Sequence, residues 1–229
     1  MLAYPARVTG AGRYLTPEQA AAVYDRVGRW QDTQRFYEHA AVDEMVAAAR
    51  FDEASYVVEV GCGTGALAAR LLGTHLPDTA HYVALDVSPK MVGLARQRLG
   101  GWSDRARVEQ VDGHGSWPVP DSVADRVVAT YVLDLLPPSA IEAFFAEARR
   151  VLRPGGLVAT ASLAAGTGPA SRLVAGSWSR LWRVNPHLTA GCRPVDAAAL
   201  LPSGWRVTET RTLTSWAVPA AVLVAERLA

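Results

Sequence analysis

A glycine-rich turn near residue 60 is the part of the sequence with the clearest chemistry. Gly61, Gly63 and Gly65 stand at alternate positions directly after a short apolar run. Glycines between a strand and a helix let the backbone approach a ligand closely, and the helix start then offers unpaired N–H groups. Such a turn suits a nucleotide-like ligand. Together with Ala66, the spacing also fits the dinucleotide fingerprint of dehydrogenases, so the turn alone leaves two ligand classes open.

Three carboxylates distinguish these ligand classes. Asp86 stands 21 residues after Gly65, where a carboxylate can accept hydrogen bonds from both hydroxyls of a ribose. Asp112 with Gly113 follows a later apolar run, where a carboxylate can accept from the exocyclic amine of adenine. Glu59 precedes the glycine turn, where it would attract an amino group and repel the phosphates of a dinucleotide. The set therefore favours a cationic nucleoside that carries an amino acid.

The segments around these groups predict an α/β fold. Short runs rich in β-branched residues alternate with helical stretches, which is typical of right-handed βαβ units with helices on both faces of a parallel sheet. Only Thr214-Ser215 separates the last two runs, so these must pair antiparallel. We predict a Rossmann-like, doubly wound sheet of about seven strands, mostly parallel, with one antiparallel strand near the C-terminus. The predicted strands are 56–60, 82–85, 107–111, 125–132, 157–163, 205–213 and 217–225.

Capping signals and apolar spacing define the predicted helices. The caps are Thr16 with Gln19, Ser88 before Pro89, and Ser139 with Glu142. Residues 1–52 are expected to form N-terminal helices, one from Pro17 to about Gly28 and one over about 32–49. A turn is expected at 154–156. Residues 164–204 form a long connection that we interpret as an ordered cap, with a helix over 194–201. The whole chain, 1–229, is expected to be a single domain.

Composition excludes several classes of protein. Half of the 229 residues are hydrophobic, and 23 basic residues nearly balance 22 acidic ones, which indicates a globular protein and argues against a nucleic-acid coat. Cys62 and Cys192 make neither a disulfide framework nor a zinc pattern, so no metal is expected. No apolar run is long enough to span a membrane, and the N-terminus lacks a secretory pattern. We therefore expect a cytoplasmic monomer or homodimer without a membrane or nucleic-acid partner.

At this point the sequence resembles a known family, the class I S-adenosylmethionine-dependent methyltransferases of the small-molecule type. The resemblance runs from about Tyr24 to the C-terminus, and the antiparallel strand predicted near the end is also typical of that family. The motifs that carry it stand in order at family-like spacing: Val57-Val58-Glu59-Val60-Gly61-Cys62-Gly63-Thr64-Gly65, Leu85-Asp86-Val87-Ser88-Pro89-Lys90-Met91, Val111-Asp112-Gly113 and Val151-Leu152-Arg153-Pro154-Gly155-Gly156.

The resemblance implies S-adenosylmethionine as cofactor, S-adenosylhomocysteine as product, and a set of cofactor contacts. The three glycines of the turn would lie under the methionine part, and Asp86 would hold the ribose. Tyr131 would lie beside the methionine and the transferred methyl group. The other implied contacts are Val87, Met91, Asp112 and Gly113 around the adenine, and Tyr24 and Tyr37, which resemble helix residues that close over the cofactor.

The acceptor is expected to lie under the cap. Trp178 and Trp182 suggest an apolar or aromatic acceptor. No acidic residue occurs between Glu147 and Asp196, so Arg183 and Arg193 are candidates to pair with a carboxylate or phosphate on it. We expect a small organic acceptor, aromatic or anionic, methylated on oxygen or nitrogen.

A general base is required only if the acceptor atom carries a proton. The candidates are His114, Asp134 and His187, and we select His187 because caps over strand ends carry substrate contacts. Two alternatives stay open. One is a protein of this fold that binds the cofactor without transferring methyl; the other is a dinucleotide-dependent oxidoreductase, which Glu59 and Asp112 disfavour.

Overall fold

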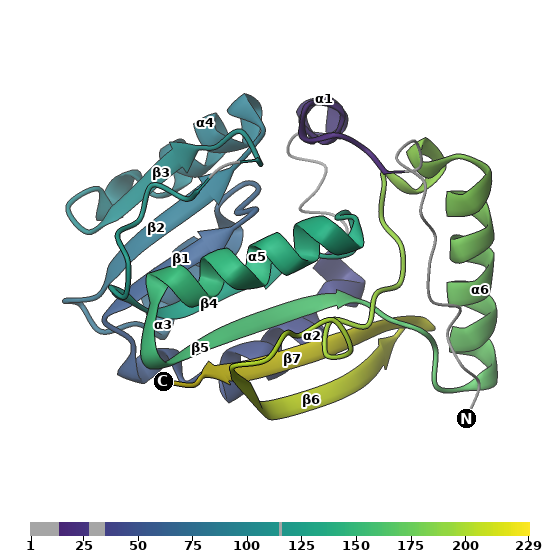
Figure 1. The fold of residues 1–229 in the computed structure, drawn as a ribbon. Coiled ribbons are helices and arrows are strands. Elements are labelled where there is room, and N and C mark those ends of the chain that lie inside the picture. The colour runs from purple at the N-terminus through teal and green to yellow at the C-terminus, as the bar shows by residue number, and fades with distance from the viewer. Residues whose placement is uncertain (1–13, 28–34, 115) are drawn as a thin grey trace.

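The computed structural model describes residues 14–27, 35–114 and 116–229 and contains one seven-stranded sheet (Figure 1). The strand order is β3-β2-β1-β4-β5-β7-β6. Strands β1 to β5 run parallel, and β7 is antiparallel to both of its neighbours. This confirms the predicted fold. The bounds are β1 Tyr56–Val60, β2 His81–Asp86, β3 Ala106–Gln110, β4 Ala124–Thr130, β5 Leu152–Leu163, β6 Trp205–Ser215 and β7 Val218–Arg227.

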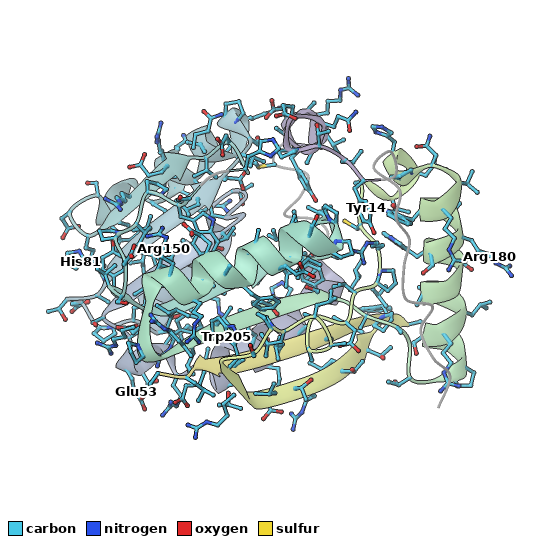
Figure 2. The ribbon with its side chains drawn as sticks, viewed as in Figure 1. Tyr14, Glu53, His81, Arg150, Arg180 and Trp205 are labelled. Carbon is cyan, nitrogen blue, oxygen red and sulfur yellow. The ribbon has the colours of Figure 1, made fainter. Side chains whose placement is uncertain are left out.

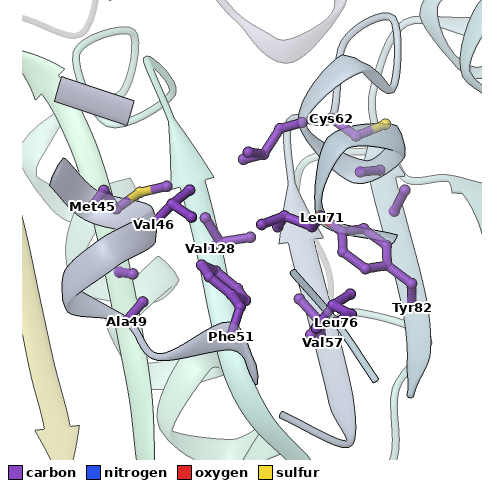
Figure 3. Packing of buried hydrophobic residues seen from close by; sticks show 14 of the residues in the cluster. Met45, Val46, Ala49, Phe51, Val57, Cys62, Leu71, Leu76, Tyr82 and Val128 are labelled. Atoms are coloured by element: carbon purple, nitrogen blue, oxygen red, sulfur yellow. The ribbon is translucent and has the colours of Figure 1, made fainter. Parts of the chain in front are cut away.

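Helices cover both faces of the sheet, as the alternation of strands and helices predicted. One buried cluster joins α2, α3 and α4 to one face, with Met45, Leu71 and Tyr82 fully buried (Figure 3). The other joins α5 to the opposite face through Phe145 and Ile141. The helix bounds are α1 Pro17–Val27, α2 Arg35–Ala48, α3 Ala66–Thr74, α4 Pro89–Arg98, α5 Pro138–Val151 and α6 Pro169–Val184, with 3-10 turns η2 Phe51–Glu53, η3 Gly100–Trp102 and η4 Pro186–Thr189. No helix in the described part of the chain is both long and apolar enough to cross a membrane.

Two of the predicted caps are confirmed. The Thr16 hydroxyl accepts from the Gln19 backbone N–H at 3.3 Å, and the Gln19 side chain accepts from the Thr16 N–H at 3.0 Å. The Ser88 hydroxyl accepts from the Met91 N–H at 3.0 Å at the start of α4. Both caps satisfy backbone donors that a helix start leaves without partners.

The prediction that Ser139 caps α5 was wrong. The helix begins one residue earlier, at Pro138, and Pro137 occupies the cap position without a side-chain hydrogen bond. The Pro137 carbonyl accepts from the N–H groups of both Ala140 and Ile141 at 3.0 Å. Proline at the first helical position is already set in the helical conformation and needs no donor partner, so the helix can start there.

The expected turn at 154–156 is part of β5. Leu152 pairs with Ala124 and Leu157 pairs with Arg126, so residues 153–156 lie opposite a single residue of β4. Gly155 adopts a φ of 80°, which accommodates these extra residues. The segment is therefore an irregularity within a twelve-residue strand.

The cap contains a different helix from the one expected. Residues 194–201 are not helical, because the N–H of Arg193 donates to the Asp134 carbonyl and that of Val195 to the Leu163 carbonyl. These bonds hold the chain extended. The helix of the cap is α6, which was not predicted from the sequence. The connection between β6 and β7 also lies two residues later than expected, at residues 216 and 217.

A polar cluster ties the amino ends of β1 and β4 together, on the side of the sheet away from the glycine turn. Asp125 is fully buried, and its Oδ2 accepts from the Ser55 N–H, the Ser55 hydroxyl and the Tyr56 N–H at 2.8, 2.6 and 3.1 Å. Arg126 donates to the Ala49 and Arg50 carbonyls at 2.6 and 2.9 Å. This clamp fixes the end of α2 to the sheet.

Candidate functional site

The glycine turn lies between β1 and α3, as predicted, and requires glycine for two reasons. Gly61, Gly63 and Gly65 have φ values of 70°, 52° and 74°, which side chains disfavour. A Cβ on Gly61 would also lie 2.3 Å from Cγ2 of Val132, which follows β4. The Gly61 N–H donates to the Leu85 carbonyl at 2.8 Å. The turn is therefore bound to the end of β2 and packed against the end of β4.

Asp86 links the glycine turn to the start of α4. It is 8% exposed, and its Oδ2 accepts from the Gly63 N–H at 2.8 Å while its Oδ1 accepts from the Ser88 N–H at 2.9 Å. Burial raises the pKa of Asp86, and these backbone donors act in the opposite direction. Both oxygens retain further acceptor capacity, because each carboxylate oxygen has two lone pairs.

Glu59 is almost completely buried in β1, directly before the turn. Its Oε2 accepts from the Tyr82 hydroxyl at 2.9 Å, and it is 1% exposed. Burial, together with the nearby Asp86, raises the pKa of Glu59 to about 8, against the lowering effect of the tyrosine hydrogen bond. The carboxyl group is therefore largely protonated at neutral pH and can ionise when a cation comes near.

A pocket opens beside the turn at the carboxyl edge of the sheet. Glu59, residues of α2 and Tyr131 are among the residues that line it. Tyr131 follows β4 with a φ of 55°, and its N–H donates to the Ala161 carbonyl at 2.7 Å. The lining residues are Glu38, His39, Val42, Glu59, Gly61, Cys62, Gly63, Thr64, Ala66, Leu67, Arg70, Thr130 and Tyr131. The side chain of Tyr37 lies outside the described residues.

Helix α1 lies beside α4 (Figure 1). The Ser88 hydroxyl donates to Asp25 Oδ1 at 2.5 Å, and the Lys90 ammonium donates to the Asp25 carbonyl at 2.6 Å. A Cβ on Gly113 would lie 2.9 Å from Pro17 and 3.1 Å from Val87. The predicted adenine contacts are therefore together. Met91 is buried in α4, and Asp112 accepts from the His114 N–H at 2.8 Å.

A second buried carboxyl group, Asp134, lies beyond the end of β4. It is 0% exposed, and neither of its oxygens has a hydrogen-bond partner in the described part of the chain. Burial and Glu38 raise the pKa of Asp134 to about 7. Its own backbone N–H, Arg193 and the Cys192 thiol act in the opposite direction, but none forms an ion pair or a well-aligned hydrogen bond with it. Tyr24 of α1 lies close by. Burial raises the pKa of its hydroxyl, and the nearby Cys192 and Asp134 raise it further.

The cap residues predicted to contact the acceptor hold the cap together. The indole N–H of Trp178 donates to the Cys192 carbonyl at 2.9 Å, and that of Trp182 donates to the Gly191 carbonyl at 3.1 Å. The Arg193 guanidinium lies 5.2 Å from the ring centre of Tyr14 and donates to the Leu136 carbonyl at 2.7 Å. These contacts fix the loop at 191–193 over the end of β4.

The structure brings together only part of the predicted set. The glycines, Glu59 and Tyr131 line one pocket, and Asp86 and Tyr24 lie at its margin. Arg183 and His187 are exposed on α6 and η4, away from the pocket lining. Figure 2 shows Arg180 of the same helix pointing outward. The roles of Trp178, Trp182, Arg183, Arg193 and His187 toward an acceptor stay predictions.

Other residues of the pocket were not foreseen. Glu38 and His39 on α2 and Arg70 on α3 line it, although they stand in ordinary helical stretches. Nothing in their local sequence distinguishes them from solvated helix residues. The packing of α2 against the sheet, whose end is fixed by Arg126, brings Glu38 and His39 to the pocket, and α3 brings Arg70.

Comparisons with known proteins agree with this geometry. Residues 57–156 match the model of a methyltransferase domain family. The chain is 36% identical over 115 residues to malonyl-[acyl-carrier protein] O-methyltransferase of Geobacter sulfurreducens, covering 50% of this chain and 41% of that protein. It is 30% identical over 114 residues to carboxy-S-adenosyl-L-methionine synthase of Chromohalobacter salexigens, covering 50% and 42%. The chain therefore matches less than half of the length of these relatives.

Solved structures share the fold over nearly the whole chain. The [4+2]-cyclase SpnF superimposes with a TM-score of 0.69 at 19% identity and covers 94% of this chain and 98% of its own. At this identity the likeness concerns the fold alone. Residues 57–156 thus correspond to a methyltransferase domain, and the relatives and the fold support a class I S-adenosylmethionine-dependent methyltransferase.

Proposed function

We propose that the protein transfers a methyl group from S-adenosylmethionine to an oxygen or nitrogen atom of a small organic acceptor. The observation that carries the proposal is the pair Glu59 and Asp86 on either side of the glycine turn. A buried carboxyl group with a pKa of about 8 can ionise beside the ammonium of a methionine moiety, and its ionised form would repel a pyrophosphate. The turn itself has no room for a Cβ at Gly61, because the Val132 side chain packs against it.

The chain's own residues divide the work of holding the cofactor. Glu59 and the glycine turn would hold the methionine end, and Asp86 would accept from the ribose hydroxyls. Val87, Met91, Asp112 and Gly113 would surround the adenine. Tyr131, on the pocket wall after β4, would lie beside the methyl group. Tyr24 of α1, with Tyr37 of α2, would close the site and exclude water.

The proposed reaction mainly requires that the acceptor atom, the methyl group and the sulfur are aligned. The bound cofactor supplies a methyl group on a positively charged sulfur, so the donor is already activated. The protein has to place the acceptor atom in line with the methyl group and keep water out, which is worth several orders of magnitude in rate. The half-buried Tyr131 and the pocket-lining residues of α2 and α3 would perform this task.

Calorimetric titration with S-adenosylhomocysteine tests the cofactor assignment. We expect binding to the purified protein, and Asp86→Ala should weaken it at least about tenfold by removing charge-assisted hydrogen bonds. Asp104→Ala, which removes an exposed carboxylate from a turn, is the matched control and should bind like the wild type. Binding of NAD with no binding of S-adenosylhomocysteine would overturn the assignment, and unchanged affinity in Asp86→Ala would remove that residue from the site.

A second function remains worth testing because two of the similar proteins carry names of other reactions, a carboxy-S-adenosylmethionine synthase and a [4+2]-cyclase. A protein of this kind would bind the cofactor without transferring its methyl group. Incubation with S-adenosylmethionine and a library of alcohols, phenols, amines and carboxylates separates the two. Release of S-adenosylhomocysteine that depends on an acceptor supports methyl transfer. Tight cofactor binding without release across the library supports the second function.

A further inference from the structure

We propose that Asp134 is the catalytic base of this protein, which takes the proton from a hydroxyl or amine acceptor as that acceptor is methylated. The inference rests on the proposed methyl transfer and names the acceptor class of the same site. It places the proton-transfer role at the end of β4 rather than at His187, which is exposed on the cap.

The burial of Asp134 without partners is the first observation. Its side chain is 0% exposed, and both oxygens lack hydrogen bonds in the described part of the chain. A buried polar group without a partner costs on the order of 1–3 kcal/mol, and more when it is charged. A fold seldom keeps such a group for stability, so an unsatisfied buried carboxyl group calls for a ligand that completes it.

The position of Asp134 is the second observation. It stands three residues after Tyr131, which lines the pocket. Glu38, which faces Asp134 electrostatically from α2, lines the same pocket. The carboxyl group thus lies close to Glu38, which lines that pocket, although Asp134 itself is buried behind the pocket lining.

The groups around Asp134 keep it available as a base. Those facing it are Tyr24 of α1, Glu38 of α2, and Cys192 and Arg193 of the loop after η4. Arg193 is the natural counter-ion, but its guanidinium is held by the Leu136 and Pro194 carbonyls and by the rings of Tyr14 and Trp182. A close ion pair with an arginine would lower the pKa of Asp134 and make its carboxylate too weak a base. With a pKa of about 7 it is matched to neutral pH.

The step balances as follows. The acceptor atom forms a bond to the methyl carbon, and the bond between that carbon and sulfur breaks with its electron pair passing to sulfur. The proton on the acceptor atom passes to a carboxylate oxygen of Asp134. The products are the methylated acceptor, neutral S-adenosylhomocysteine and a protonated Asp134, which returns its proton to solvent when the site opens.

The experiment compares wild type, Asp134→Asn and Asp134→Glu in the library assay. Asp134→Asn should lower kcat at least 100-fold with hydroxyl and amine acceptors, in the range typical of a lost general base. Carboxylate acceptors, which carry no proton at neutral pH, should keep their kcat. The wild-type rate with hydroxyl acceptors should rise with pH and level off above about 7, whereas Asp134→Asn should show no such rise. Asp134→Glu should recover part of the rate.

Two readouts separate this inference from its alternatives. Affinity for S-adenosylhomocysteine should stay within about twofold of wild type in Asp134→Asn, and Asp104→Asn should match wild type throughout. If the wild-type protein did not bind S-adenosylhomocysteine, the proposed function itself would be refuted. Retained kcat of Asp134→Asn with hydroxyl acceptors, or an equal loss with carboxylates, would refute the role of Asp134 alone. A carbonyl infrared band of a protonated acid that titrates near pH 7 should be present in wild type and absent in Asp134→Asn; no difference between them would also refute it.

Discussion

Asp125 and Asp134 lie at opposite ends of β4 and are both fully buried, yet their surroundings differ completely. Asp125, at the amino end, receives three hydrogen bonds from Ser55 and Tyr56 and has Arg126 and Arg153 within 4 Å. Asp134, beyond the carboxyl end, receives none in the described part of the chain. Asp125, within β4, thus stabilises the fold through hydrogen bonds, whereas the Asp134 carboxyl group, after the end of β4, has no hydrogen-bond partner in the described part of the chain.

The difference shows how the molecule separates stability from chemistry. At the amino edge, Asp125 Oδ2 accepts three hydrogen bonds and Arg126 donates to two carbonyls, so the cluster fixes β1, β4 and the end of α2 in one arrangement, although Asp125 Oδ1 accepts none in the described part of the chain. At the carboxyl edge, Glu59 and Asp134 have raised pKa values mainly because burial disfavours their ionised forms. Parallel sheets collect ligand sites at their carboxyl edge, so the unsatisfied groups lie where a ligand can complete them.

The largest expected effect concerns Asp125, at the amino end of β4. Asp125→Ala leaves the Ser55 and Tyr56 donors unpaired and the buried Arg126 without its nearest carboxylate, so we expect a loss of about 3–5 kcal/mol in the free energy of unfolding. Urea denaturation measures it. Asp121→Ala removes an exposed carboxylate that pairs with Arg150 and should cost less than about 1 kcal/mol. A loss at Asp125 no larger than that at Asp121 would erase the contrast between the two ends of the strand.

The second effect has the opposite sign. Asp134→Asn should raise the free energy of unfolding at pH 8 by roughly 1–3 kcal/mol, because the folded state no longer has to bury an unpaired carboxylate. The pKa of Asp134 is raised to about 7 in the folded state. The contribution of its protonated form to the free energy of unfolding is therefore fully present below pH 4 and is lost as the pH rises to 7. The advantage of the variant should therefore be larger at pH 8 than at pH 5, by urea denaturation at both values. An equal advantage at both would mean that the carboxyl group does not titrate in this range.

The smallest expected effect concerns Glu59, the other buried carboxyl group at the carboxyl edge of the sheet. In the free protein Glu59 is protonated below about pH 8, and the ammonium of S-adenosylhomocysteine favours its ionised form. Affinity should therefore rise with pH up to about 8, by at most tenfold per unit, and then level off. Calorimetry in buffers of different ionisation enthalpy should detect the proton released on binding. Glu59→Gln should lose both the slope and the proton release; if it keeps them, another group is responsible.

The sequence predicted the features that depend on neighbouring residues. The strands, the glycine turn and Asp86 follow from local patterns of β-branched residues, glycines and caps, and the structure places the turn and Asp86 together. It also predicted the reversed strand, because a two-residue connection allows no crossover. Only the exact position of that connection shifted, to residues 216 and 217.

What was missed depends on contacts between distant segments. The expected helix at 194–201 does not form because backbone donors at Arg193 and Val195 bond to Asp134 and Leu163. The wall of the pocket formed by Glu38 and His39 depends on how α2 packs. Asp134 was one of the candidate bases predicted from the sequence, but its complete burial could not be foreseen from an apolar turn that contains a single acid.

The outermost strand, β6, has a consequence for how the protein behaves at high concentration. It forms one edge of the sheet, and its outward-facing backbone groups are a template on which strands of other molecules could assemble. Charged side chains occur along this edge. Arg206 pairs with Glu226, and Arg211 pairs with Glu44 of α2. Any strand that added here would have to strip water from these charges, so the open edge is protected against aggregation without a covering helix.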